Sequence, residues 1–130
     1  MAVYRGGQSV KRVYRGDTEV WSLSSGASGT WSGGSFNTYG ETVAEYVMPV
    51  DAYIEIEWSI YITAAGPSGA RARMKLNNLA NNDLNAGTTI RGPGTSTATG
   101  ALQVSAGDAI QFEVYGFSAT ASGGDWTVSW

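Results

Sequence analysis

Closely spaced carboxylates are the residues of this chain best suited to chemistry. Asp51, Glu55 and Glu57 fall within one short segment, and paired carboxylates can hydrolyse glycosidic bonds. However, Glu55 and Glu57 lie on one side of an alternating strand pattern, where charged side chains are usually solvated. Solvated strand charges are therefore the favoured interpretation. We expect no catalytic residue and no enzymatic activity.

The residue inventory narrows the chemistry further. The chain of 130 residues has no cysteine and no histidine, which removes thiol nucleophiles, disulfides and the commonest general base and metal ligand. Oxygen ligands for Ca²⁺ could come from one polar segment, whose members are Asn77, Asn78, Asn81, Asn82 and Asp83. Their spacing matches no EF-hand loop, and a polar turn is the favoured interpretation. We expect no metal and no cofactor.

Charge is unevenly distributed along the chain. Residues 1–25 carry a net charge of +2, and residues 26–130 carry a net charge of −5. An acidic body argues against nucleic-acid binding. The basic segment is compatible with docking onto an acidic protein surface, or with a solubilising mixture of charges. No apolar run approaches the roughly 20 residues of a membrane span, and no signal peptide is recognisable, so we expect synthesis in the cytoplasm and no membrane insertion.

The segment over residues 53–63 must form a strand. Apolar side chains alternate with polar ones along it, and a period of two is typical of a half-buried strand. The apolar face comprises Ile54, Ile56, Trp58, Ile60 and Ile62, and the opposite face comprises Tyr53, Glu55, Glu57, Ser59, Tyr61 and Thr63. The first set is the predicted core.

A turn over residues 66–69 predicts that residues 71–76 pair with this strand as a hairpin. In that register Met74 faces Ile60 on the buried side, and Arg73 faces Tyr61 on the solvent-exposed side. Lys75 then meets Ser59 and lies diagonally from Glu57, so that opposite charges come together.

The remaining segments also indicate β structure. Residues 106–108 and 123–125 are expected turns, and Trp126, Val128 and Trp130 share one face of a final strand. No segment predicts a helix. Many short strands with regular turn signals indicate a sandwich or barrel. We expect an attachment arm over residues 1–25, a flexible Gly/Ser linker over 26–34 and the main domain over 35–130.

The N-terminal arm contains one four-residue motif twice. Val3-Tyr4-Arg5-Gly6 recurs as Val13-Tyr14-Arg15-Gly16, and each copy reads as strand, turn, strand. Such a unit is too small to bury a face alone, so it needs a neighbour. Aromatic and arginine side chains are typical of protein interfaces. The predicted partner-docking residues are Val3, Tyr4, Arg5, Val13, Tyr14, Arg15 and Trp21; the alternative is that the arm folds back on its own body.

Tyrosines on the body suggest a second contact surface. Tyr39, Tyr46, Tyr53, Tyr61 and Tyr115 could stack against sugars or pack between subunits.

The body resembles the trimeric jelly-roll heads of tumour necrosis factor and complement-type globular domains. Val50-Asp51-Ala52-Tyr53-Ile54 lies where that family has a Gly-Tyr pair, with Ala52 in place of the glycine. Residues 102–110 resemble the family's Leu-x-Leu-x-x-Gly-Asp-x-Val turn. The resemblance implies an all-β, antiparallel jelly-roll β-sandwich that forms a homotrimer, here with a short N-terminal β-hairpin arm. Because that family trimerises through aromatic sheet faces, the resemblance also implies that Tyr53, Tyr61 and Tyr115 form the oligomer interface.

The arm resembles the openings of many bacteriophage minor tail and other virion proteins. The matching string is residues 13–21, Val-Tyr-Arg-Gly-Asp-Thr-Glu-Val-Trp. This resemblance implies a structural protein located in the virion, bound by its arm to the capsid or tail and displaying the trimeric body for decoration, stabilisation or as a small fibre head. The alternative is a head that binds a receptor or a host-surface glycan.

Overall fold

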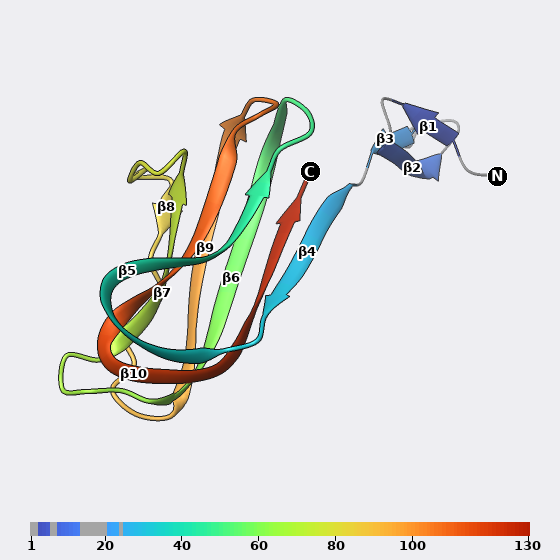
Figure 1. Cartoon of the computed structure of the whole chain (residues 1–130). Coiled ribbons are helices and arrows are strands. Elements are labelled where there is room, and N and C mark those ends of the chain that lie inside the picture. Colours follow the sequence, from blue (N-terminus) through green and yellow to red (C-terminus); the bar gives the residue numbers. More distant parts are fainter. Residues whose placement is uncertain (1–2, 6–7, 14–20, 24) are drawn as a thin grey trace.

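The computed structural model describes residues 3–5, 8–13, 21–23 and 25–130, without the side chains of residues 1–24 and 38. Every regular element within these ranges is a β-strand, and the strands form two separate sheets (Figure 1). The predicted fold class is confirmed: the body is an all-β antiparallel sandwich, preceded by a β arm.

The arm forms a sheet of its own. Its strands are β1 (Val3–Arg5), β2 (Gln8–Val13) and β3 (Trp21–Leu23), paired antiparallel in that order. The predicted hairpin corresponds to β1 and β2, and β3 adds a third strand. Val3 pairs with Val10, and Val13 pairs with Trp21. Residues 14 and 15 lie outside the described ranges.

One layer of the sandwich carries the predicted long strand. It contains β4 (Gly26–Trp31), the end of β10 (Ala109–Ser129), β6 (Ala52–Ala64), β9 (Gly94–Val104) and β8 (Leu84–Asn85), in that spatial order. The predicted apolar face of β6 is confirmed, because its five members have relative exposures between 0% and 3%. Figure 1 shows the long strands of this layer running side by side.

The other layer is built on the first half of the same β10. Here β5 (Gly34–Val47) pairs with one edge of β10 and β7 (Ala70–Leu76) with the other. The β5–β10 register shifts around Gly116, and Ser118 has a positive φ of 49°. These irregularities accompany the bend that carries β10 from one layer to the other (Figure 1).

Aromatic side chains fill the space between the layers. The ring of Phe112 stacks on that of Trp126 with centroids 4.8 Å apart, although both residues belong to β10. Trp58 contacts Phe112 at 5.7 Å and Trp31 at 6.4 Å. The two halves of β10 therefore face each other across one core.

Three expectations about local structure are wrong. Residues 26–31 of the expected linker form β4, because this stretch pairs with β10 and places Trp31 against the core. The segment over 71–76 does not pair with β6; it pairs with β10, where Met74 faces Phe112. Residues 123–125 lie within β10, where Gly124 leaves room for the neighbouring Trp58 ring.

Candidate functional site

The outer face of the β6 layer presents small polar side chains in rows. Because strands pair in register, residues at the same height line up across the sheet. One row crosses five strands and consists of Ser28, Thr127, Glu57, Thr99 and Asn85. The next row contains Thr30, Asp125, Ser59 and Thr97, in which the hydroxyls of Ser59 and Thr97 are 2.7 Å apart.

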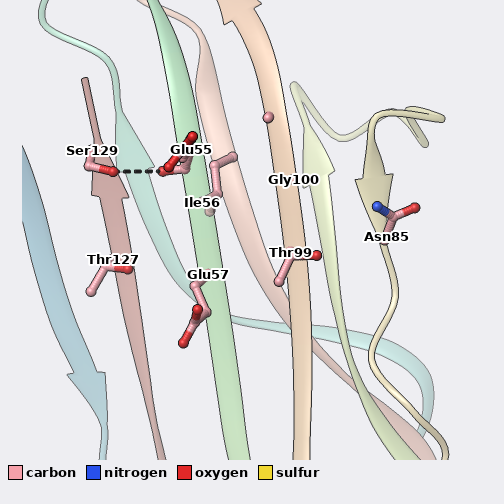
Figure 2. Close-up of a pocket in the computed structure, with 9 residues that line it drawn as sticks. Glu55, Ile56, Glu57, Asn85, Thr99, Gly100, Thr127 and Ser129 are labelled. Carbon is pink, nitrogen blue, oxygen red and sulfur yellow. Dashed lines mark hydrogen bonds between the residues drawn. The ribbon is translucent and has the colours of Figure 1, made fainter.

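The first of these rows borders a shallow hollow of about 400 Å³. Figure 2 shows Glu55 and Glu57 on β6, with side chains from β10 on one side and from β9 and β8 on the other. The polar lining residues are Glu55, Glu57, Asn85, Thr99, Thr127 and Ser129. Carboxylate, amide and hydroxyl groups at one surface can bind the hydroxyls of a sugar or the cationic groups of a protein.

The carboxylates of this face have no cationic partner within the described part of the chain, where the ion pairs found join Arg73 and Lys75 to Glu113. The predicted proximity of Glu57 to Lys75 is wrong, because β7 belongs to the other layer. Glu55 and Glu57 are exposed to solvent, as the favoured interpretation predicted. This face is therefore acidic and available for contact.

Tyr61 and Asp125 are linked on the same face. The Tyr61 hydroxyl donates a hydrogen bond to Oδ2 of Asp125. This bond raises the pKa of Tyr61, and the partial burial of the phenol and the negative charges of Asp125 and Glu57 raise it further. The phenol is held neutral as a hydrogen-bond donor.

The outer face of the β7 layer has the opposite character. Arg71, Arg73 and Lys75 alternate with buried residues along β7 and project outward together. Beside them lies Glu113 of β10, whose carboxylate is 3.7 Å from Nε of Arg73 and 3.5 Å from Nζ of Lys75. Glu113 is only 3% exposed, so it neutralises part of this cationic row from below.

Aromatic rings extend the cationic row. The guanidinium carbons of Arg71 and Arg73 each lie 5.1 Å from the centroid of the Tyr115 ring. Tyr39 contacts Tyr115 at 5.9 Å and Phe117 at 4.6 Å, and it is 69% exposed. We call Arg71, Arg73, Tyr115, Tyr39 and Phe117 the aromatic–arginine face. Stacked aromatic and arginine side chains are typical of binding surfaces.

The predicted interface tyrosines do not share a surface. Tyr53 and Tyr61 lie on the outer face of β6, with exposures of 62% and 39%. Tyr115 belongs to the aromatic–arginine face of the other layer. No side chain of the predicted docking residues in the arm is described; the strands place Tyr4 opposite Ser9 and Arg5 opposite Gln8.

Sequence reasoning did not predict a role for Glu113, and it left Tyr39 open between stacking against sugars and packing between subunits. The alternating basic residues of β7 were a signal that an anion lies nearby, but the register assigned them to the wrong strand. The bulge in β5 that brings Tyr39 and Gly40 beside β10 has no clear sequence signature.

The asparagine-rich loop is a structural turn. Asn77 and Asn78 have positive φ angles of 52° and 62°, a conformation that asparagine tolerates well. The Asn77 amide donates to Asp108 at 3.1 Å and accepts from the Ala109 amide at 2.8 Å. Asn81 accepts from the backbone of Asp83 at 2.9 Å. These bonds support the polar-turn interpretation.

Comparisons with known proteins assign no family. No protein-family model matches the chain, and no curated protein matches its sequence. The crystal structure of FLHE is similar with a TM-score of 0.48 at 14% sequence identity, covering 82% of this chain and 95% of that one. A likeness at that level leaves the function to be inferred from the residues themselves. Among the described residues, no helix has the length and apolar character needed to cross a membrane.

Proposed function

We propose that this chain is a non-enzymatic structural protein of a bacteriophage virion. Its arm would attach to the capsid or tail, and its sandwich would be displayed as a homotrimer. The observation that carries this proposal is the repeated Val-Tyr-Arg-Gly motif, which resembles the N-terminal segments of virion proteins. The described strands of the arm pair with one another and with no strand of the body, a layout suited to an attachment module.

Physical reasoning supports attachment through the arm. A three-stranded sheet of short strands buries little surface of its own, and its edges can pair with another chain. The arm is basic while the body is acidic, so the two parts favour different partners. Several arms on one oligomer would bind a particle far more tightly than a single arm, through their effective concentration.

The test is binding of the purified protein to particles that lack it. We expect the full chain to co-sediment with such particles, and a variant without residues 1–24 to remain in the supernatant. The Tyr4→Ala, Tyr14→Ala double variant should also bind weakly. Unchanged unfolding midpoints would show that the body is intact in both variants. Equal binding of the full chain and the arm-less variant would overturn the proposal.

The second candidate function is binding of a host-surface glycan. The observation that favours it is the hollow of Figure 2, where carboxylate, amide and hydroxyl groups converge. Uncharged sugars are recognised by such groups through their paired hydroxyls. Binding to a glycan array that disappears on Glu57→Gln and Asn85→Ala substitution would support it. Particle binding through the arm combined with no glycan binding would leave the structural function alone.

A further inference from the structure

Charge is segregated between the two outer faces of the sandwich. The β6 face carries Glu55, Glu57 and Asp125, and its hollow is lined by no basic residue. The β7 face carries Arg71, Arg73 and Lys75, three of the four basic residues in 26–130. Glu113 and Glu45 lie on that side as well, where Glu45 accepts a hydrogen bond from Gln111 at 2.8 Å. Glu41 of β5 is the third acid of this layer, but Glu113 is buried, so three cations and two acids of the layer reach the surface.

This segregation disfavours contacts between identical faces. A two-fold interface places a surface against its own copy, which here would oppose acid to acid or arginine to arginine. Like charges brought together at an interface are costly. Contact between the β6 face of one copy and the β7 face of another instead brings opposite charges together. A head-to-tail arrangement is therefore the one that the charges favour.

The side chains on each face also match in kind. On the aromatic–arginine face, Arg71 lies over the Tyr115 ring and forms no ion pair within the described residues, where the ion pairs involve Arg73 and Lys75. Arg71 is only half-buried, and carboxylates are the acceptors that arginine binds best. The β6 face offers exposed carboxylates that lack such a donor, around a hollow that can admit a long side chain.

The placement of the tyrosines fits the same arrangement. Tyr53 and Tyr61 lie on the acidic face, whereas Tyr115 and Tyr39 lie on the aromatic–arginine face. One symmetric interface could not contain both sets. A contact between unlike faces contains both at once, because each copy contributes a different surface.

We propose that copies of this chain associate head to tail, with the aromatic–arginine face of one copy seated on the acidic hollow of the next. Arg71 of the first copy contacts Glu57 and its neighbours on the second. This contact supplies the surfaces for the self-association in the proposed function, and in that respect the inference rests on the proposed function. A closed ring forms if successive rotations return to the start, and an open chain forms if they do not.

The test uses two charge reversals in the full chain, Arg71→Glu and Glu57→Lys. Arg73 and Lys75 are left alone because they hold the buried Glu113. The wild type should form oligomers in sedimentation velocity experiments. Each single variant should associate on the order of 30-fold or more weakly, since reversing one partner of a charge pair breaks the contact. Glu41→Lys, which makes the same charge change on β5 outside the hollow, should leave association unchanged.

Mixing the two single variants gives the decisive result. Arg71 of the Glu57→Lys variant can bind Glu57 of the Arg71→Glu variant, and the two reversed residues form a second opposite-charge pair between the same two variants. The mixture should therefore regain the association that each single variant has lost, with the two variants alternating. The double variant carries both reversals and should regain self-association. Circular dichroism of each variant confirms that it is folded.

The contrary results are equally distinct. A wild type that is monomeric at all concentrations, or single variants that associate as the wild type does, would overturn the inference. The inference would also be overturned if Arg71→Glu kept the oligomeric mass of the wild type but lost a binding to polygalacturonate that the wild type shows. That result would assign this face to an anionic polymer. Because the measurement needs no virion, particle attachment through the arm can succeed or fail independently of it.

Discussion

The indole Nε1 of Trp58 donates a hydrogen bond to the backbone carbonyl of Glu113, 2.9 Å away. Trp58 belongs to one layer, and Glu113 lies on the half of β10 that belongs to the other. The bond is buried, and Trp58 has no solvent exposure. One side chain thus joins the core, the two layers and the strand that carries the buried carboxylate.

Replacing Trp58 with Phe should destabilise the protein substantially. The change removes the hydrogen bond to Glu113 and leaves space beside Phe112, so we expect a loss of about 2 kcal/mol in unfolding free energy. Urea denaturation measures it. Trp31→Phe is the matched control, because Trp31 is only partly buried and should cost less. Equal losses in the two variants would contradict a special role for Trp58.

Glu113→Gln should also lower stability, although it preserves shape. Arg73 and Lys75 would lose the anion between them while remaining only 25% and 28% exposed. We expect a cost of about 2 kcal/mol, below that of a fully buried pair because the cations are partly solvated. Chemical denaturation at neutral pH tests it, with the exposed Glu45→Gln as control. A neutral effect would show that the buried charge is dispensable.

Gly124→Ala should disturb the core through overpacking. A Cβ at this position would lie 2.7 Å from both the Trp58 ring and the Ser59 carbonyl, so something must move. The expected cost is about 1–3 kcal/mol. Gly92→Ala is the control, because its Cβ would meet nothing within 4 Å. Thermal unfolding should separate the two variants clearly, and similar midpoints would refute the close approach.

The turn before β10 should make stability depend on acid pH. The Ser105 amide and the Asn77 side chain both donate to Asp108, and these bonds lower its pKa below the ordinary value of 3.8. The lowered pKa stabilises the fold above pH 3.8, and this stability is lost as pH falls through the folded-state pKa. Asp108→Asn should weaken that dependence. Urea titrations at several acid pH values would reveal a difference, and parallel curves would contradict it.

Tyr61 should titrate above its ordinary pKa of 10.0, because ionisation breaks its bond to Asp125. The bond stabilises the fold fully below pH 10.0, and its contribution disappears as pH rises through the raised pKa. Phenolate absorbance of the wild type minus that of Tyr61→Phe isolates this group. Asp125→Asn should move its pKa back toward 10.0; no movement would exclude Asp125 as the main cause.

Local patterns predicted the elements better than their partners. The alternation over residues 53–63 identified β6 and its buried face because a period of two reflects the strand itself. Pairing depends on distant residues, so the turn at 66–69 suggested a hairpin that the structure lacks. A strand long enough to serve both layers shows the same alternation as two short strands. Its Gly123 and Gly124 therefore read as a turn.

The candidate site was predictable in composition but not in arrangement. Tyr53, Tyr61 and Tyr115 were correctly expected to lie away from the core, since they alternate with apolar residues. Which layer each one faces follows from pairing, which the sequence pattern does not encode. The burial of Glu113 was also hidden, because a glutamate on the polar side of a strand is ordinarily solvated.

The shared strand also constrains how the molecule can be made. Every other strand of the sandwich precedes β10 in the chain, and β4, β5, β6 and β7 all pair with it. During synthesis, β10 therefore emerges from the ribosome after the strands that pair with it. Until then their edges stay open to association with other chains. We expect the strands of this body to fold together once β10 has been synthesised. Shorter nascent chains should contain little stable structure.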